Sequence, residues 1–152
     1  GSPAALSYCE PVDVGWFSHA EPFEMDIRAF RYAADARRFW GGTPSIAPFV
    51  IANAGLETLL EIGIETITAA NSRLVDLLLD NIPRSCVRSP TNPARRGGTV
   101  VVDTPHNDKL AVALDAARVH YDQRADGIRL SPHIYNDDAD ILAAAGCIRD
   151  NC

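Results

Sequence analysis

Residues 46–80 carry the pattern that most constrains the fold of this 152-residue chain. Large apolar residues recur there at the three- and four-residue spacing that lines one side of a helix. Gly63 interrupts the pattern, and Pro83 ends it. The sequence therefore predicts a long helix over this region that is kinked at Gly63, with its second part covering about Glu65–Asn81.

Three short strands are predicted after the helical region. Thr99–Asp103 contains a run of β-branched valines, which is typical of a strand. Gly127–Ser131 alternates apolar and polar residues, and Ser85–Ser89 is short enough for a third strand. Turn residues separate these segments, as in Asn92-Pro93 and Gly97-Gly98.

Two further helices are predicted between and after the strands. Asp108–Tyr121 has apolar residues on one side, and Asp137–Ala145 follows Asn136 or Asp137 as an N-cap. Gly146 is expected to end the last helix. The order of elements indicates an α+β fold, in which a long connecting helix precedes a small antiparallel or mixed sheet with helices packed on one face.

Composition narrows the classes of partner. The net charge is −6 with acidic residues spread along the chain, which argues against nucleic acid as a partner. The absence of an apolar run of eighteen residues and of a basic, apolar start predicts neither a membrane span nor a signal peptide. Four scattered cysteines, without a C-x-x-C pair, do not suggest a metal site. We expect a cytoplasmic protein in which these cysteines are free thiols: Cys9, Cys86, Cys147 and Cys152.

Few residues have the chemistry of a functional site. Arg129 lies between apolar neighbours in a predicted strand, so it is either a solvated arginine or a fork that binds a carboxylate. Trp16 either fills a core or offers its indole N–H to an anion. The turn Gly41–Pro44, which precedes a helix, is either a plain turn or an anion site made of backbone N–H groups and the Thr43 hydroxyl. The four histidines are widely separated, and none is assigned a catalytic role.

Three motifs in a fixed order resemble the class V aminotransferases. They are Gly15–His19 (GWFSH), Phe39–Pro44 (FWGGTP) and Gly127–Asn136 (GIRLSPHIYN). The first is particularly similar to kynureninase, and the group also contains cysteine desulfurases and isopenicillin N epimerase. The resemblance covers the chain to about residue 145, whereas the tail Gly146–Cys152 matches nothing in the family.

The resemblance implies a fold type I enzyme that uses pyridoxal phosphate. In this family the cofactor is carried by a lysine of the large domain, and that lysine would lie upstream of this sequence. Lys109, the only lysine, has a helical context that does not match. The resemblance therefore implies an amino-acid substrate, a homodimer and a missing N-terminal large domain, without which the chain is expected to be inactive.

The same resemblance divides the chain into four segments. Residues 1–45 would belong to the cofactor and dimer-interface region, and residues 46–81 would be the connecting helices. Residues 82–146 would form the small C-terminal α+β domain, and residues 147–152 a tail.

Site residues are carried over position by position. Arg129 matches the arginine that grips the substrate α-carboxylate, and Phe17 matches a residue beside the substrate. Trp16, Gly42 and Thr43 match residues near the cofactor phosphate, with the Gly42-Thr43 turn reaching across the dimer. The motif around Arg129 departs from kynureninase, so hydrolysis at Cβ–Cγ, loss of sulfur and epimerisation all stay open.

Two alternatives make no use of a cofactor. The chain would be a non-catalytic α+β module that associates with itself or a partner, or a small-molecule binding domain with its own pocket. The fragment hypothesis differs from the association module, because it predicts exposed apolar surface on the N-terminal segment and near Arg129.

Overall fold

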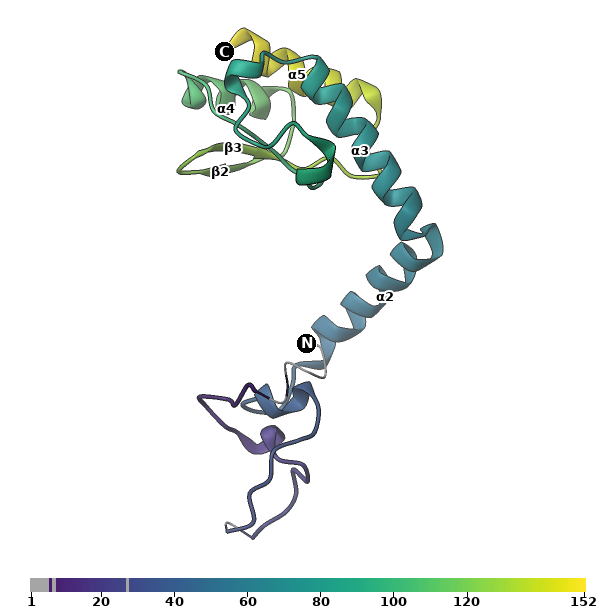
Figure 1. Ribbon diagram of the computed structural model, residues 1–152, viewed down its shortest axis with the longest axis vertical. Coiled ribbons are helices and arrows are strands. Elements are labelled where there is room, and N and C mark those ends of the chain that lie inside the picture. The colour runs from purple at the N-terminus through teal and green to yellow at the C-terminus, as the bar shows by residue number, and fades with distance from the viewer. Residues whose placement is uncertain (1–5, 7, 27) are drawn as a thin grey trace. The chain divides into compact units, whose positions relative to one another are not determined.

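The chain forms two compact units, Gly1–Gly55 and Leu56–Cys152 (Figure 1). The computed structural model describes residues 6, 8–26 and 28–152. No single helix among these residues has both the length and the apolar character to cross a membrane, although the helices α2 and α3 together, as a bent pair, meet that test.

The N-terminal unit consists mainly of turns and extended segments. Its short 3₁₀ helices are η1 (Trp16–Ser18) and η2 (Ala36–Phe39), and an isolated bridge pairs His19 with Tyr32. This irregular structure matches the Gly-, Pro- and aromatic-rich sequence, which lacks the apolar periodicity of a longer element.

The predicted long helix is broken at Gly63, as the sequence indicates, and forms two helices. They are α2 (Ile46–Ile62) and α3 (Ile64–Asp80), separated at Gly63. The φ angle of Gly63 is 89°, a left-handed value that favours glycine and breaks the helical path. The two helices therefore do not share one axis.

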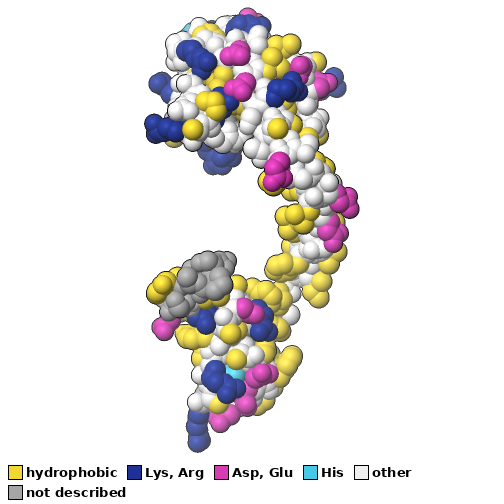
Figure 2. All heavy atoms as spheres, turned by 45° about the vertical axis from the view of Figure 1, so that its right-hand side comes forward, with side chains coloured by type: hydrophobic (Ala, Val, Ile, Leu, Met, Phe, Trp, Pro, Cys, Tyr) yellow, Lys and Arg dark blue, Asp and Glu magenta, His cyan; other side chains and the backbone are white. Residues whose placement is uncertain are grey.

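The α2 and α3 helices differ sharply in burial. None of the α2 side chains is buried, and apolar side chains cover much of its visible surface in Figure 2. The exposed large apolar residues of α2 are Ile46, Phe49, Val50, Ile51, Leu56, Leu59, Leu60 and Ile62. By contrast, α3 buries one apolar stripe that includes Leu74 and Leu78.

The C-terminal unit is built on a three-stranded antiparallel sheet in the order β1-β3-β2. Its strands are β1 (Val100–Val102), β2 (Asp122–Arg124) and β3 (Gly127–Leu130). The helices α4 (Asn107–Ala116) and α5 (Asp138–Asp150) lie on the same side of the β2–β3 hairpin (Figure 1). The predicted α+β class is confirmed, and strands β1 and β3 lie where the sequence places them.

Three local predictions were wrong. Residues 85–89 do not form a strand: η3 (Arg84–Cys86) is a 3₁₀ turn, and only an isolated bridge follows, from Val87 to Val102. The α4 helix ends before residue 121, because the backbone turns to a φ of 56° at Arg118. Gly146 does not end α5, because the next turn buries Ile148 and this packing outweighs the low helix propensity of glycine.

One hydrophobic core holds the C-terminal unit together. It joins α3, the sheet, α4 and α5, and its buried members are Leu74, Val75, Leu78, Leu79, Ile82, Val100, Val102, Leu110, Leu114, Ile128, Leu130, Ile141, Ala144, Ala145 and Ile148. Asp137 caps α5, with its carboxylate accepting a hydrogen bond from the Asp140 N–H at 3.0 Å.

The expectation of four free thiols is wrong for two of the cysteines. Cys86 and Cys152 form a disulfide, with 6.3 Å between their Cα atoms. Cys9 and Cys147 are free. The bond joins the end of the chain to the turn that follows α3, and these two cysteines are 66 residues apart in the sequence, so spacing alone did not suggest the pair.

Candidate functional site

Two turns of the N-terminal unit are joined through a buried serine. Ser18, the last residue of η1, is fully buried. Its hydroxyl accepts a hydrogen bond from the Gly15 N–H at 3.0 Å and donates one to the Trp40 carbonyl at 2.7 Å. The Gly15–Ser18 turn is therefore attached directly to the segment that leads into Gly41–Thr43.

Gly15 brings the same two turns into close backbone contact. A Cβ atom added at Gly15 would overlap the carbonyl oxygen and carbonyl carbon of Gly41. No side chain larger than hydrogen fits there without a shift of the backbone. A Cβ atom at Gly41 or Gly42 would meet nothing within 4 Å, so the second turn is open on its other side.

The residues predicted to bind the cofactor phosphate lie on these turns. Trp16 is 57% exposed, and its ring packs edge-on against Phe23 with 6.1 Å between centroids. Gly42 and Thr43 are exposed immediately before α2 begins. Phe17 is half-buried. The structure brings the two motifs together through their backbones, which leaves an indole, a threonine hydroxyl and peptide N–H groups available on the surface.

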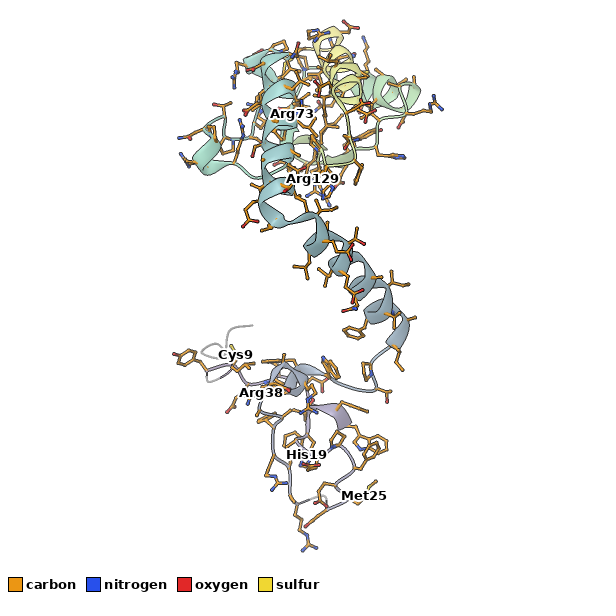
Figure 3. The ribbon with its side chains drawn as sticks, turned by 90° about the vertical axis from the view of Figure 1, so that its right-hand side faces the viewer. Cys9, His19, Met25, Arg38, Arg73 and Arg129 are labelled. Carbon is orange, nitrogen blue, oxygen red and sulfur yellow. A yellow bond between two sulfur atoms is a disulfide. The ribbon has the colours of Figure 1, made fainter. Side chains whose placement is uncertain are left out.

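His19 fixes the loop that follows η1, and Figure 3 labels it within the N-terminal unit. The ring is buried, its Nδ1 lies 2.9 Å from the Glu21 nitrogen and 2.6 Å from the Glu21 carbonyl oxygen, and its Nε2 lies 2.8 Å from the Ala29 carbonyl oxygen. The ring also contacts Phe30, with 5.2 Å between centroids. These contacts tie the His19 ring to the backbone of the loop at Glu21 and Ala29.

Each unit contains a hollow. In the N-terminal unit a space of about 360 Å³ is lined by aromatic and acidic side chains, among them Trp16, Phe30, Glu24 and Asp26. In the C-terminal unit a space of about 250 Å³ lies between the end of α4, the loop after β3 and α5. His120, Asn136 and Asp140 line this second hollow. The pKa of the Asp140 carboxyl is lowered by hydrogen bonds from the Asn136 side chain and the Asp137 backbone.

Arg129 lies on the exposed face of β3, as its alternation with Ile128 and Leu130 predicts (Figure 3). Its guanidinium is not simply solvated, because Nη2 donates to the Asp122 carboxylate at 2.5 Å. Asp122 stands directly opposite Arg129 in the β2–β3 register. The sequence prediction missed this partner, because it did not identify β2.

A second arginine shares the same carboxylate. Arg124 approaches Asp122 through Nη2 at 2.8 Å and through Nε at 2.9 Å. The trio Arg124, Asp122 and Arg129 therefore holds two positive charges and one negative charge. The surplus positive charge and the 44% exposure of the Arg129 side chain suit recognition of one further carboxylate.

Comparison with known proteins assigns the family. Residues 66–148 match the family described as the kynureninase C-terminal domain. The chain belongs to this family. Over 116 residues, 72% of its length, it is 32% identical to the kynureninase of Deinococcus radiodurans. The chain spans only 28% of that relative.

The fold comparison agrees with the family assignment. The apo structure of a cysteine desulfurase from Thermococcus onnurineus NA1 matches 93% of the chain with a TM-score of 0.75, at 20% identity, and the match covers 39% of that protein. The resemblance to a kynureninase-like class V fold, C-terminal part, is thus confirmed. Arg129 lies inside the matched kynureninase domain, whereas Trp16, Phe17, Gly42 and Thr43 precede it.

Proposed function

We propose that this chain is the C-terminal part of a kynureninase-like enzyme that uses pyridoxal phosphate and acts on an amino acid. The observation that carries the proposal is Arg129, an exposed arginine with surplus positive charge inside the matched kynureninase domain. A guanidinium binds a carboxylate through two parallel hydrogen bonds, and the α-carboxylate is common to all amino acids. In this proposal Arg129 fixes the substrate by that group.

The residues of the N-terminal unit fit one end of the cofactor. Peptide N–H groups, a hydroxyl and an indole N–H are suitable donors for a phosphate, and the Gly41-Gly42 backbone has open space beside it. Trp16, Gly42 and Thr43 would hold the phosphate, and Phe17 would lie beside the substrate. When bound, pyridoxal phosphate supplies an electron sink for bonds of the substrate.

The proposal requires a large domain in addition to the residues of this chain. The chain covers 28% of the related kynureninase, and its sole lysine, Lys109, is exposed on α4. The exposed apolar residues of α2 agree with a helix that is covered by other protein, because surfaces of this kind usually mark an interface. We propose that the cofactor lysine comes from a large domain and that the enzyme is a homodimer.

The substrate test compares two exposed arginines of the C-terminal unit in the full-length protein that contains this chain. Arg129→Ala is expected to raise KM for the amino-acid substrate about ten- to a hundredfold, because it removes a charged hydrogen-bond donor. Arg73→Ala is the matched control, since it also removes an exposed arginine that pairs with one aspartate, Asp138, but lies outside the trio. Kynurenine and cysteine are assayed first, to separate Cβ–Cγ hydrolysis from sulfur removal.

Two results would contradict the proposal. One is equal KM values for the two arginine variants, which would remove Arg129 from carboxylate binding. The other concerns this chain alone: after addition of pyridoxal phosphate and borohydride, mass spectrometry should find no stoichiometric adduct on Lys109. A full adduct there would mean that Lys109 carries the cofactor and that the alignment of motifs is wrong.

A further inference from the structure

We propose that Ser18 is a positioning residue that locks the Trp16 turn to the Gly41–Thr43 turn, so that their donors face one phosphate together. This inference rests on the proposed function and names a residue that acts on the phosphate only through its neighbours. Ser18 itself is fully buried and cannot touch a ligand at the surface.

The hydrogen bonds of Ser18 show how the lock works. Its hydroxyl accepts from the Gly15 N–H and donates to the Trp40 carbonyl, so both functions of one oxygen are used. Both contacts lie next to proposed phosphate-binding residues, because Gly15 directly precedes Trp16, and Trp40 directly precedes the Gly41–Thr43 turn. The two turns cannot separate without lengthening or breaking one of these bonds.

Backbone contact alone does not give the same control. Gly15 and Gly41 meet closely, but a van der Waals contact limits approach and not separation. The Trp40 carbonyl also belongs to the end of η2, so the serine ties the second turn to that 3₁₀ helix. With Ser18 in place, donors from two turns keep a fixed spacing before any anion arrives, which reduces the ordering required on binding.

The first measurement uses the chain without a cofactor. Trp16 lies in the first turn and Trp40 directly precedes the second, so the intrinsic fluorescence of these two tryptophans reports on this site. Ser18→Ala is expected to increase acrylamide quenching and to speed amide exchange at Gly15 several-fold. Ser18→Thr, which keeps the hydroxyl, should restore both values.

A matched control serine exists in the other unit. Ser89 also accepts a hydrogen bond from a backbone N–H, that of Val101 at 2.8 Å, but it lies far along the chain from both turns. Ser89→Ala should leave tryptophan quenching and Gly15 exchange unchanged. Equal quenching and exchange in Ser18→Ala and in the unaltered chain would contradict the proposal that Ser18 holds the two turns together.

The second measurement uses the full-length protein and pyridoxal phosphate. Ser18→Ala should weaken cofactor binding about tenfold and shift or broaden the ³¹P resonance of the bound phosphate, with rescue by Ser18→Thr. Unchanged affinity and an unchanged ³¹P resonance, together with loosened turns, would reduce Ser18 to a structural role and overturn the inference. If the unaltered protein takes up no cofactor, the proposed function itself fails, and that failure is seen before any variant is made.

Discussion

The two units of this chain are stabilised in different ways. The C-terminal unit has an apolar core that joins three helices and a sheet. Among the described residues of the N-terminal unit, the buried side chains are Ser18, His19 and Ala33, and the first two hold the backbone by hydrogen bonds. One unit therefore depends on a buried apolar core, and the other on polar contacts, pairs of aromatic rings and one close glycine contact.

This difference fits the proposed roles of the two units, in which Arg129 binds the substrate and the N-terminal unit binds the cofactor phosphate. The apolar core that fixes the strand carrying Arg129 consists of residues of the C-terminal unit itself. A unit with little apolar burial gains stability from whatever covers it, because hydrophobic burial is the main favourable contribution to folding. The exposed apolar residues of α2, at the junction of the two units, suit such a cover.

The strongest way to separate the two units is to open the apolar core. Leu114 on α4 is fully buried, and Leu114→Ala should lower the free energy of unfolding of the C-terminal unit by about 2–5 kcal/mol, through lost burial and a cavity. The loss is measured by urea unfolding followed by far-UV circular dichroism. Tryptophan fluorescence, which arises only in the N-terminal unit, should keep its emission maximum.

Val112→Ala provides the control on the same helix. Val112 is 69% exposed, so its truncation should change stability by less than about 0.5 kcal/mol. A shift of the tryptophan emission in Leu114→Ala would show that the units unfold together, and the comparison between them would then be wrong.

A smaller effect is expected from the reverse experiment in the N-terminal unit. Gly15→Ala forces a methyl group against the Gly41 carbonyl and should cost about 1–3 kcal/mol, as overpacking does elsewhere. The tryptophan emission should shift, whereas the far-UV signal of the C-terminal unit should stay. Gly41→Ala is the control, because a Cβ atom there has open space; an equal shift in both variants would argue against close contact at Gly15.

Local pattern was enough to predict much of the C-terminal unit. The valine run of β1, the alternation around Arg129 and the break at Gly63 are all properties of adjacent residues, and each was found in its expected place. The β2 strand was missed because Asp122–Arg124 contains no apolar residue; its pairing with β3 defines it. For the same reason the Asp122 partner of Arg129 was missed.

The candidate site was harder to predict from the sequence than the fold of the C-terminal unit. Trp16, Gly42 and Thr43 were found through motifs, and their roles toward a phosphate stay predictions. Ser18 carries no signal of its own, because its contact with Trp40 spans 22 residues and depends on how two turns meet. The GWFSH motif did include this serine, but only the folded backbone assigns it a partner.

The smallest expected effect is a pH dependence that belongs to the C-terminal unit. Asp103 follows β1, and its carboxylate accepts hydrogen bonds from Arg88 at 2.6 Å and from Asn107 at 2.8 Å. The Arg88 guanidinium, and then the Asn107 amide, lower the pKa of the Asp103 carboxyl below its ordinary value. This stabilisation is complete above the pKa of aspartate in the unfolded chain and is lost as pH falls through the lower folded pKa.

Asp103→Asn should therefore flatten the acid side of the stability curve of the C-terminal unit. Urea unfolding is followed by circular dichroism from neutral pH down to below the ordinary aspartate pKa, with Asp126→Asn on the hairpin turn as the control for loss of one charge. The Asp103 variant should be less stable at neutral pH and should approach the unaltered chain at the acid end. Parallel curves would mean that the exposed Arg88–Asp103 pair is screened by solvent and that the apolar core alone sets the stability of this unit.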